Sequence, residues 1–273
     1  MINIRARFIR GEQVKYISHL DMMKMFERAL RRSRIPIYYS QGFNPHPQIV
    51  FGLPLSVGVT SDAEYVDFEL SEEMEPSEFV DILNKQLPEG LKLSDAKVRT
   101  TKSNIMASIT KASYEVLVTI SQNPGIEEIG EKILDFMKNK EIFITKESKG
   151  KVKKVDIRPM IQKFSAQYIG NKRSFEDKEV DVRKLTSIAL LEYIDKLNGL
   201  NELLTNKEVN EYFGFSLLLS AGSMANLKPE FALQAFGEIS GYDLNVLKVH
   251  RSGLFIDKGD KMLNPLDNAL LAI

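Results

Sequence analysis

The stretch Ile2-Asn3-Ile4-Arg5-Ala6-Arg7-Phe8-Ile9 decides the fold class of this chain. Every second residue from Ile2 to Phe8 is apolar, and Asn3, Arg5 and Arg7 lie between them. Such a period of two is typical of a β-strand with one apolar face. The sequence therefore predicts a strand whose other face is basic and which ends at Gly11.

A helix is predicted directly after this strand. Ser18 is suited to the N-cap, and Asp21 stands three residues later as a capping-box partner. Pro36 then ends the helix. The residues expected on its buried stripe are Leu20, Met23, Phe26 and Leu30. Those expected on its outer face are Lys24, Glu27, Arg28 and Arg31.

The rest of the first hundred residues completes a βαββαβ order. Strands are predicted at 49–51, 64–70 and 91–98, and a helix at 76–87 that starts with Pro76. This order is that of the ferredoxin-like split βαβ motif. Residues 100–111 are interpreted as a polar linker.

The second half is expected to repeat the pattern. The predicted strands are 114–120, 142–145, 213–220 and 247–251, and the predicted helices are 126–137 and 229–239. A stretch at about 150–212, with a helix at 185–197, is interpreted as an insertion. The prediction is thus an α+β protein with two ferredoxin-like modules in tandem, at residues 1–100 and 110–273.

Composition limits the chemistry. The 273 residues include no cysteine, which excludes disulfides, thiolate zinc sites, cysteine nucleophiles and an iron–sulfur cluster held by these residues. The three histidines are His19, His46 and His250. No apolar run approaches the ~18 residues that span a bilayer, and the first residues do not read as a signal peptide. We expect a cytoplasmic protein without membrane contact, and the sequence indicates no cofactor and no metal.

The charge is unevenly distributed although the formal net charge is zero. Residues 1–35 contain nine basic and three acidic side chains, whereas residues 60–99 contain eleven acidic and four basic ones. A neutral total can therefore hide a basic face. The alternative is that the two segments partly neutralise each other in the fold.

This basic segment is the main functional candidate, because guanidinium groups bind phosphate oxygens bidentately and aromatic rings stack on unpaired bases. The alternative is a solvated helix face with local ion pairs such as Glu27 with Arg31. Tyr38 is a further ring in this region. The candidate RNA-binding residues are Arg5, Arg7, Lys24, Arg28, Arg31, Arg32, Tyr39 and Phe43.

The loop Gln41-Gly42-Phe43-Asn44-Pro45-His46-Pro47 is a second candidate, because its two prolines stiffen it for binding. The alternative is a structural crossover in which Phe43 fills the core and Asn44 caps a turn.

No catalytic residue is assigned; His19 and His46 are the candidates. His19 could act as a general base in RNA cleavage, or it could make local hydrogen bonds at the start of its helix. A metal site of His19, Asp21 and His46 lacks a recognisable ligand spacing.

Two further features are better explained structurally than functionally. Gly222-Ser223 precedes a helix and could cradle an anion, although a plain turn is the simpler interpretation. Asp156 and Arg158 are expected to form a structural ion pair.

Several blocks of this sequence resemble the radical SAM-linked protein family of bacteria. They are Tyr16–Asp21, Phe26–Arg32, Tyr39–Pro47, Leu53–Val59, Val155–Pro159 and Ser220–Glu230. Members of that family are typically encoded beside or fused to a radical SAM protein, often near ribosomal-protein and ribonuclease genes. The resemblance identifies no catalytic residue, and it implies that any radical chemistry belongs to the partner.

Three hypotheses follow from the residues and the resemblance together. The first is a non-catalytic accessory that binds RNA, such as tRNA or rRNA, and works with a radical SAM enzyme in RNA or ribosome modification. The second is a protein-interaction subunit that docks the radical SAM partner without RNA contact. The third is a metal-independent endoribonuclease that uses His19 or His46.

Overall fold

The computed structural model describes residues 2–148, 151–171 and 211–272. The chain forms two compact units of mixed α+β structure. Unit 1 comprises Met1–Lys111, Ala221–Met224 and Gly253–Ile273, and unit 2 comprises Ala112–Ser220 and Ala225–Ser252. This differs from the expected division at 1–100 and 110–273, because the last part of the chain belongs to unit 1. The predicted helix at 185–197 lies outside the described residues.

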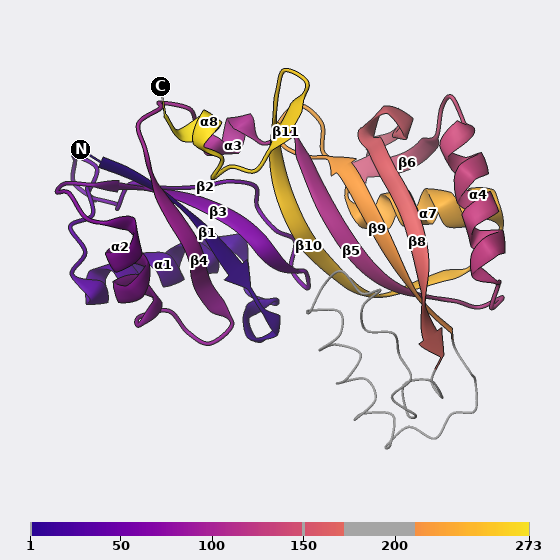
Figure 1. The fold of residues 1–273 in the computed structure, drawn as a ribbon, viewed down its shortest axis with the longest axis horizontal. Helices are drawn as coiled ribbons and strands as arrows, with labels where there is room; N and C mark the ends of the chain where they lie inside the picture. Colours follow the sequence, from indigo (N-terminus) through magenta and orange to yellow (C-terminus); the bar gives the residue numbers. More distant parts are fainter. Residues whose placement is uncertain (1, 149–150, 172–210, 273) are drawn as a thin grey trace. The chain divides into compact units, whose positions relative to one another are not determined.

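Unit 1 is built on an antiparallel sheet in the order β4-β1-β3, with β2 paired to β3. Two helices, α1 and α2, lie on one face of this sheet (Figure 1). Its elements, in chain order, are β1 (Ile2–Arg10), the 3-10 turn η1 (Glu12–Val14), α1 (His19–Ser33), β2 (Ile49–Phe51), β3 (Thr60–Leu70), α2 (Pro76–Asn84), β4 (Leu91–Arg99) and α3 (Ile105–Ser108). The later elements of the unit are the end of β10 (Leu244–Lys258), β11 (Lys261–Leu263) and α8 (Asn268–Leu271).

The core of unit 1 lies between the sheet and the two helices. The apolar side of β1 is buried there as predicted. It packs against a cluster of phenylalanine rings whose centroids lie 4.9–6.1 Å apart. The rings are Phe8, Phe26, Phe51, Phe68 and Phe79.

Helix α1 begins after a capping serine and ends at a residue in the left-handed conformation. Ser18 is the N-cap, and its hydroxyl accepts a hydrogen bond from the Asp21 amide at 3.2 Å while it donates to the Asp21 carboxylate at 2.7 Å. At the other end Arg34 adopts a left-handed conformation with φ 58°. The predicted cap is confirmed, but the predicted stripe is partly wrong because Leu20 is 67% exposed. The buried residues are Met22, Phe26, Ala29 and Leu30.

The predicted linker at 100–111 is not simply polar chain. It contains α3, and the side chains of Ile105 and Ile109 in this stretch are almost fully buried. The segment is thus packed into unit 1 and is part of its core.

The main sheet of unit 2 has the order β10-β5-β9-β8. Its helices α4 and α7 pack on it through Phe136, Phe164, Phe215 and Phe236, whose ring centroids lie 5.1–5.9 Å apart. A separate two-stranded sheet joins β6 to β7. The elements are β5 (Lys111–Ile120), α4 (Ile126–Lys138), β6 (Phe143–Ser148), β7 (Lys151–Asp156), the 3-10 turn η2 (Arg158–Met160), β8 (Ile161–Asn171), β9 (Glu211–Ser220), α7 (Pro229–Ser240) and β10.

The prediction for the middle of unit 2 was wrong in one respect. The strand expected at 142–145 exists as β6, but it pairs with β7 in the small sheet. The strand that completes the main sheet is β8, which pairs antiparallel with β9 and lies within the expected insertion.

Candidate nucleic-acid interface

The outer face of α1 carries a row of exposed cations, Lys24, Arg28 and Arg31, hereafter the cation row. Spacings of four and three residues place side chains on one face of a helix. Lys24 lies 3.8 Å from the Asp21 carboxylate, a distant pair between two exposed side chains. Within the described ranges, Arg28 and Arg31 make no hydrogen bond or ion pair, so the Glu27–Arg31 pair of the alternative interpretation is absent there. The cation row is therefore available for an anionic partner.

Arg32 differs from the cation row because it has a structural role. Its guanidinium donates to the backbone oxygen of Gln86 at 2.5 Å and to the side-chain oxygen of the same residue at 3.3 Å. Both contacts connect α1 to the segment that follows α2. Arg32 remains exposed, but part of its hydrogen-bonding capacity is already used.

The acidic segment does not neutralise the cation row through ion pairs. Helix α2 packs beside α1 and exposes Glu78 and Asp81. In the part of the chain that the structure describes, no ion pair joins the two helices. The helical layer of unit 1 thus has one basic and one acidic helix side by side.

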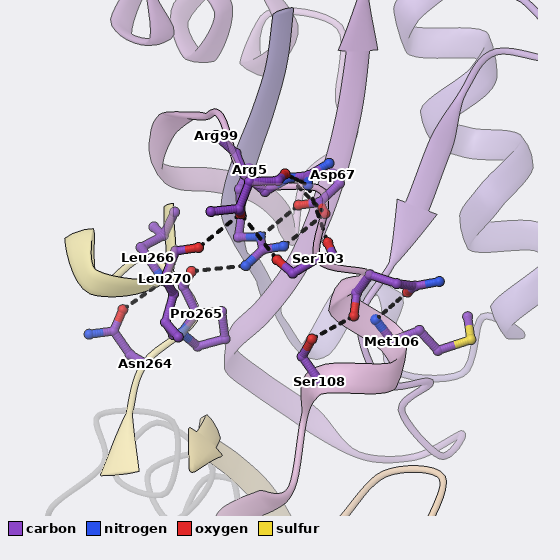
Figure 2. Close-up of polar contacts among 12 residues, drawn as sticks. Arg5, Asp67, Arg99, Ser103, Met106, Ser108, Asn264, Pro265, Leu266 and Leu270 are labelled. Atoms are coloured by element: carbon purple, nitrogen blue, oxygen red, sulfur yellow. Dashed lines mark hydrogen bonds and ion pairs between the residues drawn. The ribbon is translucent and has the colours of Figure 1, made fainter. Parts of the chain in front are cut away.

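Arg5 does not belong to an exposed basic face, contrary to the expectation from the alternating pattern. It is fully buried, and its guanidinium donates to both carboxylate oxygens of Asp67, at 2.7 and 2.9 Å. A third donation, at 3.2 Å, reaches the carbonyl oxygen of Pro265 (Figure 2). Arg99 also approaches this carboxylate, with its Nε 3.4 Å from Asp67 Oδ2. The polar side of β1 is therefore covered by the last part of the chain, and Arg5 cannot contact RNA.

Arg7 is half-buried, and its Nε donates to the carbonyl oxygen of Asp62 at 2.7 Å. Its role is therefore at least partly structural. Of the eight candidate RNA-binding residues, Lys24, Arg28, Arg31, Arg32 and Phe43 are exposed, Arg7 and Tyr39 are half-buried, and Arg5 is buried.

The loop from Ser40 to His46 closes on itself through two hydrogen bonds. The Ser40 amide donates to the His46 carbonyl oxygen at 2.8 Å, and the His46 amide donates to the Ser40 hydroxyl at 3.0 Å. Phe43 lies fully exposed in this loop, so the idea that it fills the core is wrong. Tyr39 instead packs half-buried against the core of unit 1.

His19 lines a small pocket of unit 1. The pocket measures about 20 Å³, and its lining includes His19, Arg10, Glu64 and Tyr65 but not His46. This volume is room for about one water molecule. Burial, and next the Arg10 charge, lower the pKa of His19. Its ring packs edge-on against Phe51 at 5.5 Å. The geometry favours the structural interpretation of His19 over catalysis.

Arg10 is a buried anchor that the sequence did not reveal. Its guanidinium donates to the carbonyl oxygens of Lys15 and Ile17 at 2.9 and 2.6 Å. Longer donations of 3.4 and 3.3 Å reach the carbonyl oxygens of Val14 and Leu55. These hydrogen bonds hold the turn at residues 14–17. Tyr16 lies on this turn and is 73% exposed. Tyr16 was not a candidate, because no local pattern indicates that an aromatic ring before a helix remains in water.

The Asp156–Arg158 pair and the Gly222-Ser223 turn, which the sequence indicated, both have structural explanations. The Asp156 carboxylate accepts from the amides of Ile142 and Arg158, and the Arg158 guanidinium donates to the Met137 and Ile161 carbonyl oxygens. The expected ion pair is therefore replaced by backbone contacts. Gly222 has φ +111°, and a Cβ there would lie 2.1 Å from the Ile109 oxygen, so this turn requires glycine.

The described residues include neither a candidate metal centre nor a membrane-spanning helix. No group of three or more histidine, aspartate or glutamate side chains there could hold a metal ion. No helix among them is long and apolar enough to cross a membrane.

Comparisons with known proteins place the chain by family. Among solved structures, a chain of a Cbf5-Nop10-Gar1 complex is similar with 10% identity and a TM-score of 0.42, and the match covers 93% of this chain and 48% of that chain. This chain thus spans about half the length of that structure. An unknown protein from Galdieria sulphuraria matches with 10% identity and a TM-score of 0.22, over 90% of this chain and 96% of that one. No curated protein matches significantly. A family model matches residues 3–207, and the chain therefore belongs to the family described as an uncharacterized protein conserved in bacteria (DUF2344).

Proposed function

We propose that this chain is a non-catalytic RNA-binding accessory protein, and that the cation row of α1 supplies its phosphate contacts. The observation that carries the proposal is the exposure of Lys24, Arg28 and Arg31 along one helix face without a close acidic partner in the described residues. Seven residues of helix extend over about 10 Å, so the three side chains can reach successive phosphates of one strand. Guanidinium groups suit this role because their fork of donors matches phosphate oxygens.

The proposed partner in the cell is a radical SAM protein, with tRNA or rRNA as the bound nucleic acid. The resemblance of the Tyr16–Asp21 and Leu53–Val59 blocks to the radical SAM-linked family supports this pairing. The 273 residues contain no cysteine to hold an iron–sulfur cluster, so radical chemistry would reside in the partner.

We further propose that both units are ferredoxin-like modules. The strand orders β4-β1-β3-β2 and β10-β5-β9-β8 support this interpretation. Apart from the small sheet, the elements of each unit follow each other along the chain as βαββαβ. In unit 2 the small sheet of β6 and β7 is then an insertion between α4 and β8. The function itself rests on the surface of α1, because a fold of this kind hosts many functions.

The test is fluorescence-anisotropy binding of labelled tRNA and rRNA fragments across a salt series. The variant Lys24→Ala/Arg28→Ala/Arg31→Ala removes the cation row. We expect wild type to bind with a log–log salt slope of roughly −0.7 per phosphate contact on a single strand, and the variant to bind more weakly with a slope flatter by about two. Arg32 is left in place because it holds Gln86.

A matched control removes the same charge elsewhere. Lys132, Lys140 and Lys163 are exposed lysines of unit 2, and their triple alanine variant should retain most of the affinity. Equal losses in both triple variants would mean that only net charge matters, and the interface on α1 would be wrong. If wild type does not bind at low salt, RNA binding is refuted.

Docking of a protein partner would then become the leading proposal. Three exposed apolar side chains of unit 1, Tyr16, Leu20 and Val57, are the observation that favours it.

A further inference from the structure

Tyr16, two residues before the N-cap of α1, exposes a large aromatic surface on unit 1. It is 73% exposed, and the nearby Leu20 is 67% exposed. Leu20, Lys24, Arg28 and Arg31 follow each other at four, four and three residues and share one face of α1. The face that carries the exposed Leu20 thus continues into the cation row, and Tyr16 lies three residues before the first residue of this helix.

The backbone on either side of this ring is held by hydrogen bonds. The buried Arg10 guanidinium holds the carbonyl oxygens of Lys15 and Ile17, the residues on either side of Tyr16. The Gly58 amide donates to the Lys15 carbonyl oxygen at 2.8 Å. Gly58 has φ +88°, and a Cβ there would lie 4.0 Å from a Tyr16 ring carbon. A turn held by a buried arginine and a close glycine is preorganised, so little entropy is lost when a ligand stacks on the ring.

One side of the ring already interacts with a cation. The Lys15 ammonium lies 5.0 Å from the ring centroid, and it is anchored by the Glu12 carboxylate at 2.8 Å. Most of the ring nevertheless remains open to solvent. A planar ligand can therefore stack on the open ring while neighbouring cations hold its charge.

The ligand that fits this arrangement combines planar apolar rings with regularly spaced negative charges. An unpaired RNA strand has both, because its bases are free to stack on a protein ring. In a duplex the bases already stack on each other, and only the phosphates are accessible to such a surface. The chemistry of Tyr16 with the cation row therefore selects single-stranded over double-stranded RNA.

We propose that unit 1 binds a single-stranded RNA segment, with one unpaired base stacked on Tyr16 and the adjoining phosphates held by Lys24, Arg28 and Arg31. This rests on the proposed RNA-binding function and names its substrate class.

The direct test uses the absence of tryptophan from this protein. Tyr16→Trp introduces a single indole, whose fluorescence a stacked base quenches. We expect quenching on titration with a single-stranded oligonucleotide and much less with a blunt duplex of the same sequence. The control variant Ile239→Trp places an indole at an exposed position at the end of α7 and should show no quenching with either ligand.

Affinity gives a second, independent measurement. Loss of one stacking contact in Tyr16→Ala should weaken single-strand binding roughly 5- to 100-fold, whereas Tyr16→Phe should bind like wild type. The salt slope should stay the same in both, because the ring carries no charge. Circular dichroism of each variant, together with the retained binding of Tyr16→Phe, separates lost stacking from lost folding.

The outcomes distinguish the two proposals. If wild type binds RNA with the expected salt slope but Tyr16→Trp is not quenched and Tyr16→Ala binds normally, stacking is refuted and the phosphate interface remains. Equal affinity for strand and duplex refutes the single-strand class. If no RNA binds at low salt, the proposed function itself fails, and an acidic peptide with apolar side chains becomes the ligand to test on this face.

Discussion

At the scale of single residues, three of the cations that this protein buries, Arg5, Arg10 and Lys248, have different surroundings. Arg5 forms a bidentate pair with Asp67, and Arg10 donates to four backbone carbonyl oxygens. Lys248 in β10 is only 3% exposed, and burial lowers its pKa to about 8. Guanidinium groups keep their proton when buried, whereas burial favours the neutral form of a lysine.

Lys248 should make the stability of the protein depend on pH. Between about pH 8 and pH 10 the folded protein has released this proton while the unfolded chain still holds it. Raising the pH through this window therefore increases the free energy of unfolding contributed by this group, by up to about 1.4 kcal/mol per pH unit. Urea denaturation at several pH values checks the slope.

The variant Lys248→Met removes the titrating group and should flatten that slope. Tyr65, whose pKa burial raises to about 12, acts in the opposite direction but only above about pH 10. An identical pH dependence in wild type and variant would show that Lys248 titrates normally.

The buried arginines also explain where sequence reasoning stopped. The alternation of β1 was predicted, and so was the basic character of its second side. The burial of Arg5 was not predictable, because its acceptor Asp67 lies 62 residues away in the sequence and Pro265 lies 260 away. Local patterns report the periodicity of a strand, but they do not report which segment will cover its polar side.

At the scale of elements, two helices end in the same left-handed conformation with different residues. Arg34 ends α1 with φ 58°, and Gly241 ends α7 with φ 78°. A side chain in this region costs about 1–2 kcal/mol, which glycine avoids. Helix α1 therefore ends under local strain and α7 does not.

Exchange of these two residue types should change stability in opposite directions. Arg34→Gly should stabilise the protein by about 0.5–1 kcal/mol, because the relieved strain exceeds the entropy that glycine adds to the unfolded chain. Gly241→Ala should destabilise it by about 1 kcal/mol, and no atom lies within 4 Å of the added Cβ to confuse the result. Chemical denaturation measures both, and a change of the same sign in both variants would contradict this account.

Element prediction succeeded where the signal was local. Ser18 with Asp21 marked the start of α1, and Pro76 and Pro229 marked the starts of α2 and α7. The stretch 161–171 was missed as a strand because polar residues interrupt its apolar ones, and only pairing with β9 shows its place. At the candidate site, helical spacing was enough to predict the cation row. The exposure of Tyr16 could not be predicted from local sequence, because the turn that carries it is held by hydrogen bonds from the buried Arg10.

At the scale of the whole molecule, unit 1 is built from both ends of the sequence. Leu266 and Leu271 are almost fully buried, and the carbonyl oxygen of Leu271 accepts from the Thr100 amide at 2.8 Å. Pro265 supplies an acceptor for Arg5. The residues after Lys258 are therefore part of the structure of the N-terminal unit.

Ending the chain after Lys258 should destabilise unit 1 by at least about 3 kcal/mol, because two buried leucines and several hydrogen bonds are lost. Hydrogen exchange of the β1 and β3 amides, with chemical denaturation, measures the effect. The control Asp260→Ala changes an exposed side chain of the same segment and should stay within about 0.5 kcal/mol of wild type. Unchanged protection of β1 in the shortened chain would refute this prediction.

The closure of unit 1 by Pro265 and Leu271 also sets an order for folding during synthesis. Residues up to Lys111 emerge first, but their last partners follow only after the whole of unit 2 has been translated. At about 5–20 residues per second, that delay is on the order of ten to thirty seconds. During this interval Arg5 and Asp67 lie on an uncovered side of the nascent sheet, so the N-terminal unit is the last to be completed although it is the first to be made.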